Sequence, residues 1–170
     1  MESGIKWVNR ENFTQGGSFL FRGVSKLNLD AKGRMAIPTR YRDGLVETCA
    51  SQLVITGDKD RCLLIYPKPA WLVIEEKLKK LSALSRSARN LQRLYIGYAH
   101  ETDMDGQGRI LLPTELREFA SLDKKVALVG QGDKFELWDE AVWSRQLDDW
   151  LNKIDEEGLE LTDELESLSL

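Results

Sequence analysis

The residues of this chain best suited to chemistry are two Asp–Arg pairs of identical spacing. Asp30 is followed four residues later by Arg34, and Asp105 is followed at the same spacing by Arg109. Two related carboxylates could form the dyad of an aspartic protease or the acid and base of a glycosidase. An arginine that folds back across a short turn would instead pair with its aspartate, lower the carboxyl pKa and keep the group ionised. We therefore expect no enzyme activity, and a carboxylate-dyad hydrolase using Asp30 and Asp105 is kept as an alternative.

The other reactive side chains are too few for a catalytic or metal site. The chain contains Cys49, Cys62 and a single histidine, His100. These residues are too few to complete a zinc site, and no residue is placed to orient a Cys–His nucleophilic pair. Both cysteines lie in or beside apolar, strand-like stretches, which favours reduced, buried thiols in a cytosolic protein. We predict no catalytic residues, no metal and no cofactor.

Both Asp–Arg pairs lie within a longer repeated segment. Residues 29–42 recur as residues 104–117 without a gap. Such a repeat indicates a tandem duplication and decides the architecture before any other assignment. The identical positions are Asp30, Gly33, Arg34, Pro38, Thr39 and Arg42, which recur 75 positions later as Asp105, Gly108, Arg109, Pro113, Thr114 and Arg117.

Each copy of the segment predicts a strand, a tight turn, a second strand and a short helix. The aspartate leads into a glycine that supplies the positive φ of a hairpin turn. An apolar run follows, and proline then ends the strand because it has no N–H. Thr39 and Thr114 stand where a helix N-cap is expected. The predicted structural turn motif comprises Asp30, Gly33 and Arg34 in the first copy and Asp105, Gly108 and Arg109 in the second.

The rest of the chain has the composition of an ordinary globular protein. Of its 170 residues, 42% are hydrophobic and 31% are charged. No apolar run approaches the roughly 20 residues of a membrane helix. Apolar residues spaced three and four apart predict helices over residues 69–95, and an acidic amphipathic segment follows Trp143. Further strands are predicted at 53–56 and 62–66, with counterparts at 126–129 and 135–138.

The distribution of charge favours a nucleic-acid partner, although the whole chain carries a net charge of −4. Residues 18–45 hold six cations against two carboxylates, a balance of +4. The equivalent residues 93–120 hold three cations against five carboxylates, a balance of −2. The asymmetry indicates that one face has been kept basic, the other interpretation being a charged surface without a partner.

Three motifs carry a resemblance to a known family. They are Phe21-Arg22-Gly23 followed by residues 28–34, the second turn at residues 104–109, and residues 129–140. From about Phe21 to the C-terminus the chain resembles the MraZ family of bacterial transcriptional regulators. The resemblance implies an α+β fold that is mainly β with helices. It would consist of two tandem swapped-hairpin, AbrB/SpoVT-like β-barrel units that form a pseudo-dimer within one chain.

The resemblance also implies a function. The chain would be a sequence-specific DNA-binding regulator, a repressor of its own division and cell-wall gene cluster, located in the cytoplasm at the nucleoid. It would bind repeated promoter boxes in double-stranded DNA as a ring-shaped homo-oligomer larger than a dimer, without a membrane partner. A ring protein that binds partners and touches no DNA is the alternative. Four tryptophans are expected to supply apolar surface for the ring: Trp71, Trp138, Trp143 and Trp150.

Lys32 and Arg34, on the first turn, are the strongest predicted DNA contacts. Arg34 either locks the turn through Asp30 or reaches a phosphate or guanine edge. Arg109 lies in the acidic copy and is expected to be structural only. The candidate phosphate contacts are Arg22, Lys26, Arg40 and Arg42.

The predicted domain organisation follows from these assignments. A further hypothesis is that the natural chain begins at Leu20, with a start site placed too far upstream, because residues 1–17 are polar and without clear periodicity. The predicted segments are 1–20, a disordered N-terminal extension; 21–67, the first AbrB-like unit, which binds DNA; 68–96, the linking helices; 97–143, the second AbrB-like unit; and 144–170, an acidic C-terminal helix and tail.

Overall fold

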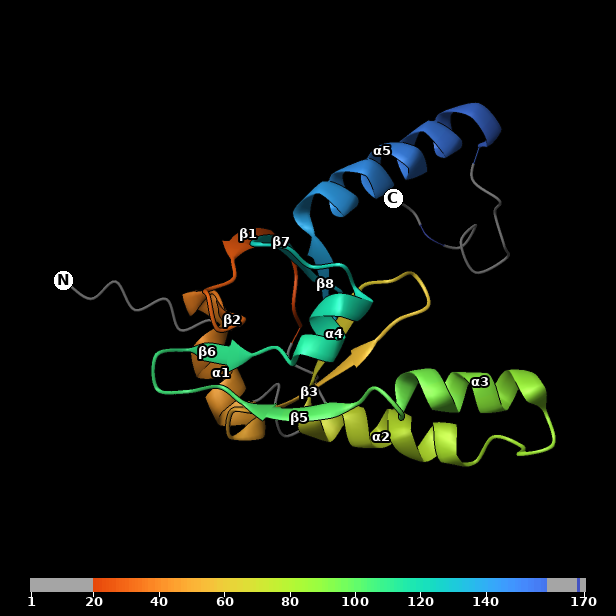
Figure 1. Cartoon of the computed structure of the whole chain (residues 1–170), viewed down its shortest axis with the longest axis horizontal. Helices are drawn as coiled ribbons and strands as arrows, with labels where there is room; N and C mark the ends of the chain where they lie inside the picture. Colours follow the sequence, from red (N-terminus) through yellow and green to blue (C-terminus); the bar gives the residue numbers. More distant parts are fainter. Residues whose placement is uncertain (1–19, 159–167, 169–170) are drawn as a thin grey trace.

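The computed structural model describes residues 20–158 and 168, in which the order strand, strand, helix, strand, strand, helix occurs twice (Figure 1). The predicted N-terminal extension and the end of the acidic tail fall outside these residues, apart from Leu20 and Leu168. The first half comprises β1 (Val24–Asn28), β2 (Arg34–Ala36), α1 (Thr39–Cys49), β3 (Gln52–Gly57), β4 (Leu63–Pro67), α2 (Lys68–Lys79) and α3 (Arg86–Tyr95). The second half comprises β5 (His100–Asp103), β6 (Arg109–Leu111), α4 (Thr114–Phe119), β7 (Lys125–Gly130), β8 (Phe135–Asp139) and α5 (Glu140–Glu157).

Strands from both repeats form one antiparallel sheet of six strands in the order β1-β7-β8-β4-β3-β5. The first strand of each repeat pairs with the other repeat, β1 with β7 and β5 with β3. At the centre, β4 pairs with β8 and joins the two halves. The predicted α+β class is confirmed. The described residues form an open sheet rather than two closed barrels, because the central pairing merges both repeats into one sheet.

A separate two-stranded ribbon, formed by β2 and β6, carries one turn at each end. Its register pairs Arg34 with Leu111 and Ala36 with Arg109. Because the strands are antiparallel, the turn before β2 and the turn before β6 lie at opposite ends of the ribbon. The strands that flank each turn do not continue as a simple hairpin, since β1 pairs with β7 while β2 pairs with β6.

The turns themselves have the predicted glycine-dependent form. In the first turn the N–H of Asp30 donates to the Arg34 carbonyl at 2.9 Å, and the N–H of Gly33 donates to the Asp30 carbonyl at 3.0 Å. Gly33 and Gly108 have φ values of +79° and +75°. A left-handed residue at the end of a three-residue loop is a common way to close such a turn, and glycine adopts it without strain.

The helices after the ribbon begin at Thr39 and Thr114, with Pro38 and Pro113 at the N-cap positions. Neither helix has a side-chain cap hydrogen bond. The predicted threonine caps are wrong by one residue, because the fixed φ of the preceding proline already turns the chain into the helix. The threonines therefore lie inside the first helical turn.

The sheet separates two apolar clusters formed by alternate residues of its strands. One cluster joins the sheet to the ribbon, α1 and α4, and its members Met35, Ile37, Ile110 and Leu112 are at most 1% exposed. This packing fixes the ribbon against the sheet. The position of both turns is therefore set by core packing as well as by backbone hydrogen bonds.

The second cluster buries two of the tryptophans that were expected at an interface. Trp71 is 3% exposed and Trp138 is 2% exposed, so their assignment to an interface is wrong. Both side chains pack between the sheet and the helices α2 and α5. The ring centroid of Trp138 lies within 6.0 Å of the ring centroids of Trp143 and Trp150. Trp143 is half-buried and Trp150 is 37% exposed.

Both cysteines are buried in the described part of the chain. Cys49 and Cys62 are free, buried thiols, and burial raises the pKa of each. No cluster of metal-ligating side chains occurs among the described residues. None of the described helices is both long and apolar enough to cross a membrane.

Candidate nucleic-acid interface

The first turn is organised around the carboxylate of Asp30. Its Oδ1 accepts the backbone N–H groups of Lys32 and Arg34, each at 2.9 Å, and its Oδ2 accepts Arg34 Nε at 2.7 Å. These bonds, led by the backbone N–H of Arg34, hold the pKa of the Asp30 carboxyl below its ordinary value. The predicted ion pair is therefore confirmed. It orients both the loop backbone and the Arg34 side chain.

The second turn repeats these bonds at almost the same lengths. Asp105 Oδ1 accepts the N–H groups of Gln107 and Arg109 at 2.9 Å, and Oδ2 accepts Arg109 Nε at 2.9 Å. The backbone N–H of Arg109 is the main cause of a lowered Asp105 pKa. The two carboxylates are ionised, occupied by their own turns and placed at opposite ends of the ribbon, so they do not form a dyad.

The turns differ in the side chain that they expose. Lys32 is exposed on the first turn, where Gln107 has the matching place in the second. Among the described residues, no carboxylate pairs with the Lys32 ammonium. The Arg34 side chain is 30% exposed, and its Nε donates to Asp30. Its two terminal nitrogens make no hydrogen bond within the described part of the chain. The first turn thus presents two neighbouring cations.

Three further predicted contacts lie on the exposed surface around β1 and the start of α1. Arg22, Lys26 and Arg40 are all exposed. Lys26 Nζ lies 3.7 Å from Glu140 Oε1, a loose surface contact. Arg40 Nη2 donates to Ser25 Oγ at 2.7 Å, which ties this helical cation to β1. Arg40 therefore lies beside Ser25 on the α1 face of the sheet, whereas Lys26 points to the opposite face, toward α5.

Arg42 is placed differently from the other predicted contacts. It is half-buried, and its Nε donates to the Ile37 carbonyl at 2.7 Å. A Cβ built at Gly108 would lie only 2.1 Å from Arg42 Nε, so the guanidinium packs directly on the second turn. Sequence reasoning grouped Arg42 with the phosphate contacts and missed this packing. The available signal was that Arg42 recurs as Arg117 in the acidic copy.

Comparison with known proteins bears on this arrangement. A family model described as "MraZ protein, putative antitoxin-like" matches residues 20–94 and again residues 95–160. The chain belongs to the MraZ family. The two matches meet at the end of α3, so each covers one repeat of the tandem duplication.

MraZ relatives resemble the chain over most of their length. A protein of Thioalkalivibrio sulfidiphilus is 58% identical over 151 residues, which cover 89% of this chain and 100% of the relative. One from Methylococcus capsulatus is 55% identical over 141 residues, covering 83% and 93%. One from Halorhodospira halophila is 53% identical over 152 residues, covering 89% and 100%. All three are named transcriptional regulator MraZ.

The family membership decides between the classes of function. MraZ proteins are transcriptional regulators and not enzymes, so this chain is a transcriptional regulator. The hydrolase alternative for Asp30 and Asp105 is thereby excluded, in agreement with the geometry of the two turns. The resemblance read from the sequence motifs is confirmed.

Proposed function

We propose that this MraZ protein is a sequence-specific DNA-binding repressor of its own division and cell-wall gene cluster. It acts on repeated promoter boxes in double-stranded DNA as a closed ring, in the cytoplasm at the nucleoid. The observation that carries the proposal is the first turn, where exposed Lys32 stands beside Arg34 on a loop held by Asp30. The matching turn of the acidic repeat offers Gln107 instead.

The chemistry of the first turn suits recognition of a DNA groove. Arg34 is fixed through Nε, and its terminal N–H groups can bind the O6 and N7 acceptors of guanine or a phosphate. Lys32 carries a compact charge suited to the neighbouring phosphate. Holding Arg34 in place before binding reduces the side-chain entropy lost on contact with DNA.

The surrounding cations would fix the register of the protein on the duplex. Phosphate contacts carry no sequence information but orient the group that reads the bases. Arg22, Lys26 and Arg40 are exposed near β1 and α1 and would serve this purpose. Arg42 packs on Gly108, so we propose a structural role for it in place of a phosphate contact.

The pairing between repeats supports the proposed pseudo-dimer. Each repeat gives its first strand to the other, and the β2–β6 ribbon pairs equivalent strands. This is the relation expected when two swapped-hairpin units that once formed a dimer are joined in one chain. The segments proposed as units remain 21–67 and 97–143, linked by residues 68–96 and followed by residues 144–170.

Apolar side chains that are exposed on helices in the described part of the chain support a ring. In Figure 1, α5 and the α2–α3 pair extend from the body on the side away from the ribbon. Such side chains favour a head-to-tail contact between the helices of successive copies, which can close into a ring with every first turn on one rim. The apolar side chains involved are 37–58% exposed: Leu72, Val73 and Leu91 on α2 and α3, and Leu147, Trp150, Leu151 and Ile154 on α5.

The proposal is tested by measuring binding to the DNA upstream of the protein's own gene. We expect a preference over scrambled DNA and an affinity that falls as the salt concentration rises, since phosphate contacts release counterions. DNA carrying several boxes should bind more tightly than one-box DNA by about 10²-fold or more, because the ring makes later contacts intramolecular. Fluorescence anisotropy against a salt series measures each quantity.

Two results would contradict parts of this proposal. Equal affinity for upstream and scrambled DNA would favour the alternative, a ring protein that binds partners without specific DNA contact. A monomer by light scattering at micromolar concentration, with equal affinity for one-box and several-box DNA, would remove the ring and its avidity.

A further inference from the structure

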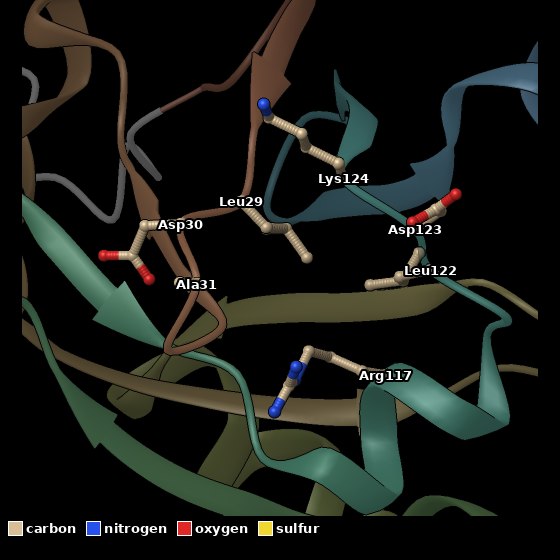
Figure 2. Close-up of a pocket in the computed structure, with 7 residues that line it drawn as sticks. All are labelled: Leu29, Asp30, Ala31, Arg117, Leu122, Asp123 and Lys124. Carbon is tan, nitrogen blue, oxygen red and sulfur yellow. The ribbon is translucent and has the colours of Figure 1, made fainter.

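Arg117 belongs to α4 in the second repeat, yet its guanidinium lies against the first turn. A Cβ built at Gly33 would lie 2.6 Å from Arg117 Cζ and 2.7 Å from Arg117 Nε, so only glycine leaves room for it. Figure 2 shows the guanidinium pointing from α4 toward the loop at Ala31. The loop that carries Lys32 is therefore supported by a side chain of the other repeat.

Arg117 is itself held in one orientation by the start of its own helix. Its Nε donates to the Leu112 carbonyl at 3.0 Å, and its Nη2 donates to Thr114 Oγ1 at 3.1 Å. The N–H of Leu112 donates in turn to the Gly33 carbonyl at 3.0 Å. Because a guanidinium is planar, these bonds fix the face that it presents to the turn.

A pocket beside the first turn makes this support important. The pocket has a volume of about 380 Å³ and is lined by residues 29–31, Arg117 and residues 122–124. The side chains of Leu29 and Leu122 point into the same space (Figure 2). Truncation of Arg117 would extend the pocket beneath Gly33, and the loop would lose its contacts there.

The arrangement is reciprocal, which supplies a control within the chain. Arg42 of the first repeat packs on Gly108 of the second turn. Its Nε donates to the Ile37 carbonyl at 2.7 Å, and the N–H of Ile37 donates to the Gly108 carbonyl at 2.8 Å. Arg42 and Arg117 therefore make equivalent contacts on opposite turns.

We propose that Arg117 is a positioning residue for DNA recognition, holding the turn that bears Lys32 and Arg34 while touching no DNA itself. This inference rests on the proposed function of the first turn. Each arginine would then support the turn of the other repeat. The arginine of the acidic repeat supports DNA binding, whereas Arg42 of the basic repeat supports the turn that does not bind.

The test compares Arg117→Ala, Arg117→Lys and Arg42→Ala in the full chain. Arg117→Ala should lower affinity for upstream DNA by about tenfold or more, as expected for loss of one well-placed base contact. Affinity for scrambled DNA should change by less than about twofold, because no phosphate contact is removed. Arg117→Lys should behave like Arg117→Ala, since an ammonium keeps the charge but lacks the planar guanidinium. Arg42→Ala should remain within about twofold of wild type on both DNAs.

Hydrogen exchange of the turn amides gives a readout without DNA. Arg117→Ala and Arg117→Lys should speed exchange at Gly33 and Arg34, whose N–H groups bond to Asp30. Arg42→Ala should instead speed exchange at Gly108 and leave the first turn unchanged. If Arg117→Ala fails to fold, Arg117→Lys carries both measurements.

The outcomes separate this inference from the proposed function. Wild-type protein without a preference for upstream DNA would remove the proposed function, while amide exchange would still decide whether Arg117 orders the first turn. If Arg117→Lys keeps the specificity of the wild type, the positive charge of Arg117 is sufficient, and the inference is overturned. Equal losses of specificity in Arg42→Ala and Arg117→Ala would also overturn it.

Discussion

The two repeats share a turn scaffold and differ in the cations around it. Six basic residues of the first repeat were predicted to contact DNA, and the second repeat keeps only two of them. Arg34 and Arg42 recur as Arg109 and Arg117. The other four are replaced by uncharged or acidic residues: Arg22 by Gly97, Lys26 by Glu101, Lys32 by Gln107 and Arg40 by Glu115.

This division matches the contacts in the structure. One recurring arginine binds the aspartate of its own turn and the other packs on the glycine of the opposite turn, so both contacts occur at both ends of the ribbon. The cations that do not recur lie on exposed surface. The recurring arginines therefore have a structural role, which Arg34 would combine with the proposed DNA contact.

The largest expected difference between the turns concerns Arg34 and Arg109. Arg34→Ala should abolish specific DNA binding, because it removes a base contact worth about 1–3 kcal/mol per protomer and a ring multiplies the loss. Arg109→Ala should leave specific binding near wild type and mainly lower stability. Affinities for upstream and scrambled DNA, measured on both variants, check the comparison.

Thermal unfolding supplies the control for this pair. Each variant loses the same side-chain bond to its aspartate, at 2.7 Å in the first turn and 2.9 Å in the second. We therefore expect similar, small losses of stability in the two variants. If both variants fold but bind DNA equally poorly, the proposed difference between a DNA-binding first turn and a structural second turn is contradicted.

A smaller effect is expected from exchanging the exposed residues of the two turns. Lys32→Gln makes the first turn resemble the second and should weaken binding to all DNA sequences alike, reducing the slope of log affinity against log salt by about one per contact. Gln107→Lys should leave specific binding unchanged, because the second turn lies at the far end of the ribbon. A gain of specific binding in Gln107→Lys would show that the ends are interchangeable.

The contacts within each turn could be predicted from the sequence because they are local. The spacing of Asp30 and Arg34 predicted their ion pair, and Gly33 predicted a positive φ; both are present. The threonine caps failed for a local reason too, since Pro38 occupies the cap position. The unit boundaries and the DNA contacts remain predictions.

The contacts between the repeats could not be predicted, because they depend on how distant strands pair. The support of Gly33 by Arg117 exists only once β2 has paired with β6. No local propensity encodes that pairing. The recurrence of Arg117 in an acidic repeat was a signal of structural use, but it did not identify Gly33 as the partner. The burial of Trp71 and Trp138 depends in the same way on the shared sheet.

The smallest expected effect is one in which the two turns should agree. The pKa values of Asp30 and Asp105 are lowered from the ordinary value of an aspartate, chiefly because backbone N–H groups of Arg34 and Arg109 bind the ionised carboxylates. A depressed folded-state pKa contributes stability that is present above the unfolded-state pKa and is lost as pH falls through the folded-state value. Stability should therefore fall at pH below about 4, and Asp30→Asn and Asp105→Asn should each remove a similar part of that fall. Urea unfolding at several pH values measures this contribution. Unequal contributions would show that the two turns differ in their Asp–Arg hydrogen bonding as well as in their exposed side chains.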